Sequence, residues 1–179
     1  MNLRTPDQNP GWMSEDDLFD VRHMVPMVYV EALPVRLDPM GYVSEVGLLF
    51  TADSEGRMTR SFVSGRVRYR ETVRAALLRN LEKDLGPMAM PQLPPSTVPY
   101  AVAEYFPAPS QSGLTDERQH AVALEYVIPV QGECQPRQDA LELSWLSPDE
   151  ALTEAVLAEF TGGRGELLRQ ALAHVGWGR

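Results

Sequence analysis

The stretch Ser64–Met88, SGRVRYRETVRAALLRNLEKDLGPM, decides the fold class of this chain of 179 residues. Between Glu71 and Leu85 its residues favour a helix, and Gly86-Pro87 ends that helix in the usual order. The apolar side chains recur at helical spacing and form one stripe: Val73, Leu77, Leu78, Leu81 and Leu85. The stretch therefore predicts an amphipathic helix that is entered through a glycine-containing loop and packs on a hydrophobic core.

Segments typical of β-strands lie on both sides of this helix. We expect strands over residues 25–37, 43–53, 58–65, 100–108, 120–130 and 141–147. A turn-forming SEGR sequence joins the second and third of these, which predicts a hairpin before the helix. Ser147-Pro148-Asp149-Glu150 starts a further helix, and residues 165–175 form the last one. The pattern indicates an α/β sandwich with a mixed sheet.

The composition is that of a globular protein with one domain, because 44% of the residues are hydrophobic and 23% are charged. Residues 1–24 are expected to form an arm with a short helix that starts at Ser14, and residues 25–179 a single domain. The lone Cys134 excludes a disulfide within the chain. No segment is typical of a membrane span or a secretion signal, so we expect a cytoplasmic protein.

The net charge of −9 argues against nucleic acid and anionic membranes as partners. It is compatible with a small phosphorylated ligand, because a few arginines can make one region of the surface positive. Arginine supplies nearly all the positive charge, and Lys83 is the only lysine in the chain.

Five residues of the opening stretch stand in a fixed order: Gly65, Glu71, Arg79, Leu81 and Gly86. In this register the sequence resembles the signature of the Nudix hydrolases, which reads Gly, five residues, Glu, seven residues, then Arg-Glu-apolar-any-Glu-Glu-any-Gly. The resemblance covers residues 25–172, and the KDLGPMAMP segment is similar to an uncharacterised Nudix-like family of unknown function. The resemblance implies a Nudix-type α/β/α sandwich. It also implies cleavage of a nucleoside diphosphate linked to another group, with Mg²⁺ or Mn²⁺ as cofactor.

The three acidic positions of the Nudix helix are occupied here by Asn80, Lys83 and Asp84. Hard divalent cations require several oxygen ligands, and carboxylates on one helix face supply them. Asn80 offers only a neutral oxygen, whereas the ammonium group of Lys83 repels a cation. Two like unit charges at ~4 Å repel by about 4 kcal/mol at an effective dielectric constant near 20, and a divalent ion would roughly double that energy. We therefore expect weak or absent binding of Mg²⁺ at this position.

The residue types and the resemblance together give three sets of candidate site residues. The candidate metal ligands are Asp84, Glu71 and Ser64. The candidate catalytic residues are Asp84, Arg79 and Glu104, with Glu125 as the second choice for an acid outside the helix. The candidates for binding the phosphates of a substrate are Arg66, Arg68, Lys83, Arg118 and His120. Each of them also has a structural interpretation, such as an ion pair of Arg79 with Glu71 or Asp84.

Three functions remain open from the sequence. The first is a pyrophosphohydrolase with an altered metal site, which uses Asp84 and an acid such as Glu104. The second is a regulatory protein that binds a nucleotide or another small anion without cleaving it, with Lys83 holding a phosphate. The third is an interaction scaffold, a homodimer whose cleft is unused.

Overall fold

The computed structural model describes residues 13–52, 56–109, 112–136 and 140–177, so most of the predicted N-terminal arm, residues 1–12, lies outside the described residues. Its helices are α1 (Glu15–Met24), α2 (Val73–Leu85), α3 (Pro148–Ala151), α4 (Glu154–Leu157) and α5 (Arg164–His174). Its strands are β1 (Met27–Leu37), β2 (Val43–Ala52), β3 (Met58–Ser61), β4 (Val63–Arg66), β5 (Ala101–Tyr105), β6 (Ala121–Pro129) and β7 (Ala140–Leu146). In these ranges, no helix combines the length and the apolar character needed to cross a membrane.

The strands form one seven-stranded sheet with the order β3-β2-β1-β6-β5, in which β4 also pairs with β1 and β7 with β2. Strands β1 and β6 run parallel from the pair Met27↔Ala121 to the pair Val35↔Pro129, whereas the other pairs are antiparallel. The hairpin expected before α2 is present, because β2 and β3 pair directly. The α/β class with a mixed sheet, which the sequence predicts, is confirmed.

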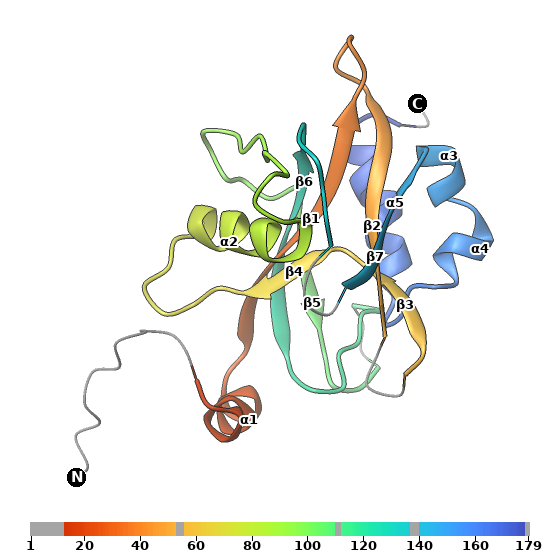
Figure 1. Ribbon diagram of the computed structural model, residues 1–179. Helices are drawn as coiled ribbons and strands as arrows, with labels where there is room; N and C mark the ends of the chain where they lie inside the picture. The colour runs from red at the N-terminus through yellow and green to blue at the C-terminus, as the bar shows by residue number, and fades with distance from the viewer. Residues whose placement is uncertain (1–12, 53–55, 110–111, 137–139, 178–179) are drawn as a thin grey trace.

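Helices cover both faces of the sheet: in Figure 1, α2 lies on one side, and α3, α4 and α5 lie on the other. The alternation of side chains along β1 accounts for this arrangement, because successive residues of a strand point to opposite faces. Val30 and Ala32 pack in one hydrophobic cluster with Leu77 of α2. Leu33 packs in a second cluster with Leu168 of α5. The sandwich therefore has two cores, one on each face of the sheet.

Three differences from the sequence prediction concern α2 and the strands before it. Helix α2 begins at Val73 rather than Glu71, because the side chain of Thr72 caps it and accepts a hydrogen bond from the backbone N–H of Ala75 at 3.1 Å. Leu78 was predicted on the buried stripe but is 41% exposed. Residues 58–65 form two strands instead of one, because the chain changes partner at the buried Phe62, from β2 to β1.

A close approach between β4 and α2 fixes the position of the helix. A Cβ atom added to Gly65 would lie 1.8 Å from Oδ1 of Asn80, so only glycine fits at this point of the strand. Asn80 is 1% exposed, and its Nδ2 donates to the carbonyl of Ala76 at 2.8 Å. The glycine that opens the Nudix-like stretch thus allows the end of α2 to pack directly on β4.

Candidate functional site

A cavity of about 550 Å³, here called the cleft, is lined by the end of α2, the start of α5 and residues of β1, β2, β3 and β4. Its charged wall residues are five cations, Arg57, Arg60, Lys83, Arg118 and Arg164, and four acids, Glu31, Asp84, Asp116 and Glu117. Arg60 is paired with Glu159, which lies outside the wall, so the charges of the wall and this partner sum to zero in a chain whose net charge is −9. A neutral wall with several cations repels an anionic ligand less than a wall with the negative charge of the whole chain would.

Lys83 lies in the cleft wall and binds two oxygen atoms. Its Nζ donates to the backbone carbonyl of Ser64 at 3.1 Å and forms an ion pair with Oδ1 of Asp84 at 3.2 Å. The side chain of Lys83 is 32% exposed and that of Asp84 only 13%. The ammonium group is therefore held between a strand carbonyl and a carboxylate, while one side of it stays open to the cleft.

Glu71 and Arg79 form a bidentate ion pair behind the cleft. Nε and Nη2 of Arg79 donate to the two carboxylate oxygens of Glu71 at 2.7 and 2.8 Å, and Nη2 also donates to the carbonyl of Arg66 at 2.8 Å. The backbone N–H of Arg68 donates to Glu71 at 2.9 Å. The hydrogen bond from Arg79 lowers the pKa of Glu71. These contacts hold the loop before α2 against the helix.

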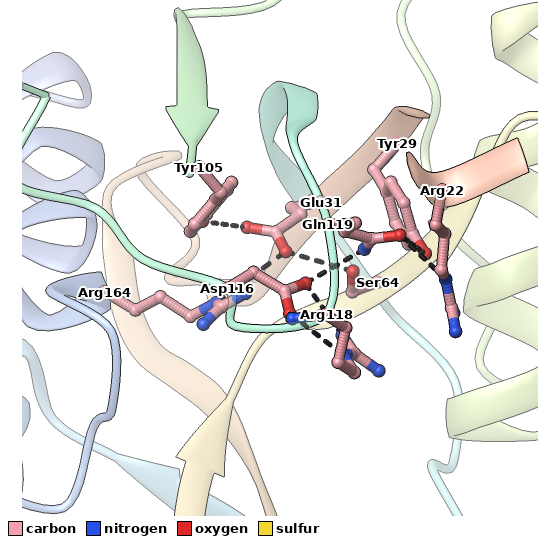
Figure 2. Close-up of polar contacts among 9 residues, drawn as sticks. All are labelled: Arg22, Tyr29, Glu31, Ser64, Tyr105, Asp116, Arg118, Gln119 and Arg164. Carbon is pink, nitrogen blue, oxygen red and sulfur yellow. Dashed lines mark hydrogen bonds and ion pairs between the residues drawn. The ribbon is translucent and has the colours of Figure 1, made fainter. Parts of the chain in front are cut away.

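Glu31 of β1 lies at the centre of a polar cluster in the cleft wall, as Figure 2 shows. The hydroxyl groups of Tyr105 and Ser64 donate to its two carboxylate oxygens at 2.7 and 3.0 Å. Nε of Arg164 lies 3.9 Å from Oε1 of Glu31. The residue is 4% exposed, so its carboxylate is satisfied by protein groups rather than by bulk water.

Glu125 forms a carboxyl pair with Glu31, because the two residues are directly opposite each other on the parallel strands β1 and β6. Glu125 is 1% exposed, and no hydrogen-bond partner of its Oε1 is found in the described part of the chain. Burial, followed by the negative charge of Glu31 and a hydrogen bond to it, raises the pKa of Glu125 to about 10. Glu125 is therefore protonated at neutral pH, and the pair shares one proton.

The loop before β6 carries a second polar network at the cleft wall. Nε and Nη2 of Arg118 donate to the two oxygens of Asp116, each at 2.9 Å. The buried Gln119 donates to Asp116 at 2.9 Å and accepts from Arg22 of α1 at 3.0 Å. Burial alone would raise the pKa of Asp116, but the hydrogen bonds and charge of Arg118 outweigh it and lower the pKa. The network joins α1 to the cleft, as Figure 2 shows.

Residues 8–177 match a family known as the domain of unknown function DUF4916. The chain belongs to this family. A protein from Jonesia denitrificans, described as a possible asymmetric diadenosine tetraphosphate hydrolase, is 54% identical to it; the match has a TM-score of 0.83 and covers 86% of this chain and 96% of that one. No curated protein matches the sequence of this DUF4916 protein.

More distant solved structures share the fold of this DUF4916 protein. A Nudix hydrolase from Nitrosomonas europaea is 14% identical with a TM-score of 0.61, over 84% of this chain and 90% of that one. The Nudix domain of Shewanella oneidensis NrtR, solved with ADP ribose, is 15% identical with a TM-score of 0.61, over 91% and 99%. The Nudix-type sandwich expected from residues 65–86 is confirmed.

The residues of this DUF4916 protein at the metal-binding positions of the Nudix helix do not fit a divalent cation. Asn80 is turned into the contact with Gly65, Lys83 brings a positive charge, and only Asp84 supplies a carboxylate. Across the described ranges, no group of three or more His, Cys, Asp or Glu residues is arranged to hold a metal ion. With Lys83 in place, a cation at this position would have one charged ligand and an adjacent ammonium group.

The structure brings some of the sequence candidates together and leaves others apart. Ser64, Lys83, Asp84 and Arg118 all line the cleft. Glu71 and Arg79 pair with each other, and backbone atoms of Arg66 and Arg68 hydrogen-bond to this pair; none of the four lines the cleft. Glu104 is exposed on β5, and His120 stacks on Phe106 with ring centroids 4.5 Å apart; neither is a wall residue of the cleft.

Glu31 and Arg164 are wall residues that the sequence analysis missed. Glu31 had a usable signal, because it is a lone acid within the apolar strand sequence VPMVYVEALPV. A charge at such a position is seldom buried without a partner or a function. Arg164 had no comparable signal, since it stands among polar residues after Gly162-Gly163.

Proposed function

We propose that this DUF4916 protein binds a small molecule with a pyrophosphate group, such as a nucleoside diphosphate linked to another group, and hydrolyses it slowly or not at all. The observation that carries the proposal is the position of Lys83. Its ammonium group is held by the Ser64 carbonyl and Asp84, at the place where the Nudix pattern calls for acids. It can offer its remaining N–H to a phosphate oxygen without an inorganic cation.

The charge of the cleft and the ligands of similar proteins support the same proposal. The wall and the partner of Arg60 together are neutral in a chain of net charge −9, and the wall includes Lys83 and Arg164, so it repels an anion less than a negatively charged wall would. The Shewanella domain was solved with ADP ribose, and the Jonesia protein is described by its relation to diadenosine tetraphosphate. Both compounds contain linked phosphate groups.

Calorimetric titration with ADP-ribose tests this proposal. We expect binding in the presence of EDTA, no gain in affinity when Mg²⁺ is in excess, and a loss of about tenfold or more in Lys83→Met, because a charged hydrogen bond contributes about 1.5–3 kcal/mol. Arg74→Met is the matched control, since Arg74 is an exposed cation of the same helix outside the cleft wall. Unchanged affinity in Lys83→Met would contradict the proposal.

A metal-dependent pyrophosphohydrolase is the second candidate function. It is supported by Asp84 in the cleft wall and by the hydrolase description of the 54% identical relative. The resident cation would then be Mg²⁺ or Mn²⁺, and its ligands would include Asp84 and the Ser64 carbonyl once Lys83 had moved away. Release of phosphate products from ADP-ribose that requires Mg²⁺ and is lost in Asp84→Ala would favour this function over the first.

A further inference from the structure

Arg164 lies at the first position of α5 and points into the polar cluster of Figure 2. Its side chain is 20% exposed and lines the cleft. It also lines a small adjoining cavity of about 30 Å³, whose wall it shares with Glu31, Ser64 and Tyr105. The guanidinium group is therefore placed between the open cleft and the buried interior.

The guanidinium group of Arg164 is held in position without using its hydrogen-bond donors. It lies over the ring of Tyr105, 4.4 Å from the centroid, and its Nε is 3.9 Å from Glu31, too far for a hydrogen bond. For the described residues, no side-chain hydrogen bond of Arg164 is found. Arg79 and Arg118 differ, because each donates two hydrogen bonds to one carboxylate.

The charges around Arg164 leave it able to attract an anion. Burial would lower the pKa of Arg164, but its electrostatic interactions with Glu31, Tyr105 and Asp116 outweigh burial and raise the pKa, so the group stays cationic. Glu125 is protonated, so only one negative charge of the carboxyl pair faces this guanidinium. Asp116 is already bound by Arg118 and Gln119. The planar fork of an arginine suits a phosphate group, to which it can donate two parallel hydrogen bonds.

Ser64 connects Arg164 to Lys83. Its backbone carbonyl accepts the hydrogen bond from Lys83, and its hydroxyl donates to Glu31, the carboxylate beside Arg164. Both cations line the same cavity, and they approach it from helices on opposite faces of the sheet. A ligand with two linked anionic groups would offer one group to each of these cations.

We propose that Arg164 is a second anion-binding residue of the cleft, which acts with Lys83 to select a diphosphate over a single phosphate group. This inference rests on the proposed function, because it takes Lys83 as the first anion-binding residue. Glu31 and Tyr105 serve as positioning residues that hold the guanidinium toward the cleft. The expected ligand is therefore a compound with at least two linked phosphates. Lys83 would bind one phosphate and Arg164 the other, with Ser64 between these two residues.

The test compares pyrophosphate with orthophosphate, titrated calorimetrically into the full chain in EDTA. We expect the wild-type protein to prefer pyrophosphate, and Arg164→Gln to bind it about tenfold to a hundredfold more weakly, while its affinity for orthophosphate, which Lys83 still binds, changes little. Arg164→Lys keeps the charge but loses the fork, so it should give an intermediate affinity for pyrophosphate. It also serves as the second variant if Arg164→Gln does not fold.

Arg169→Gln is the matched control, because Arg169 belongs to the same helix, is 52% exposed and pairs with Glu166 of that helix. If Lys83→Met weakens pyrophosphate binding while both Arg164 variants behave like Arg169→Gln, the inference is wrong and the proposed function stands. If the wild-type protein binds neither pyrophosphate nor ADP-ribose, the proposed function fails and the role of Arg164 fails with it.

Discussion

Replacing Glu125 with glutamine tests the shared proton of the carboxyl pair through its effect on stability. Glutamine keeps the shape of the side chain and puts an N–H donor where protonated Glu125 has an O–H. In the folded wild-type protein the pKa of Glu125 is raised to about 10 by burial and by Glu31, whereas in the unfolded chain it returns to its ordinary value of 4.5. Between pH 6 and pH 8 the folded state therefore binds one proton that the unfolded state lacks.

The sign of the effect follows from this difference in bound protons. Stability that depends on a raised carboxyl pKa is present at low pH and is lost as pH rises toward the folded value. One proton corresponds to about 1.4 kcal/mol per pH unit, so the free energy of unfolding of the wild-type protein should fall by about 3 kcal/mol relative to Glu125→Gln from pH 6 to pH 8. Arg164 opposes the shift, because its positive charge favours the ionised form of Glu125.

Urea unfolding at pH 6, 7 and 8 measures this difference directly, because the free energy of unfolding is extrapolated at each pH for both proteins. Glu104→Gln is the control: Glu104 is an exposed glutamate on the neighbouring strand β5, so its curve should run parallel to that of the wild-type protein. Parallel curves for the wild-type protein and Glu125→Gln would refute the shared proton. They would also imply a second negative charge facing Arg164.

Two further changes test the packing of α2 and the cation in the cleft. Gly65→Ala should lower the free energy of unfolding in urea by about 1–3 kcal/mol, because the new Cβ would lie 1.8 Å from the side chain of the buried Asn80. An unchanged midpoint of urea unfolding would contradict the close packing of β4 and α2. Lys83→Glu should create Mn²⁺ binding that calorimetry can measure, because it places two carboxylates beside the Ser64 carbonyl. Equal Mn²⁺ affinity in the wild-type protein would show that Lys83 does not block the site.

The buried position of Asn80 decides how the metal site should be rebuilt. A substitution of both Asn80 and Lys83 by glutamate would restore the acidic pattern of the Nudix helix. Asn80, however, is 1% exposed and lies against Gly65, so a longer, charged side chain there would disturb the packing of α2 on β4. The change at Lys83 alone adds a carboxylate at a position that is already 32% exposed.

The sequence predicted the parts of this protein that depend on local pattern. The spacing from Gly65 to Gly86 identified α2 and the Nudix fold, and it assigned Lys83 and Asp84 to acidic positions of the Nudix helix. Arg66 and Arg68 were predicted to bind phosphates, but no spacing in the sequence indicated whether they line the cleft, and neither does. Their loop is turned toward Glu71 and Arg79, and that direction depends on an ion pair eight residues apart.

The interior of the site was not predictable in the same way, because it is assembled from distant segments. Glu31 meets Tyr105, Glu125 and Arg164 only after β1, β5 and β6 have paired and α5 has packed on the sheet. No spacing in the sequence relates these positions. The lone acid in an apolar strand marks Glu31 as unusual, but its partners become visible only in the folded protein.

If this protein binds a pyrophosphate as we propose, the source of positive charge in the cleft determines whether the ligand binds as a free anion or as a metal complex. A site built from three carboxylates attracts a pyrophosphate only as its metal complex, because the bare anion would be repelled. At the corresponding positions of α2 the charges here are zero for Asn80, positive for Lys83 and negative for Asp84, so they sum to zero. Fixed cations from Lys83 and Arg164 favour the free anion instead, and a ligand already neutralised by Mg²⁺ gains less from them. Added Mg²⁺ should therefore compete with the protein for the ligand, the opposite of its effect on a metal-dependent hydrolase.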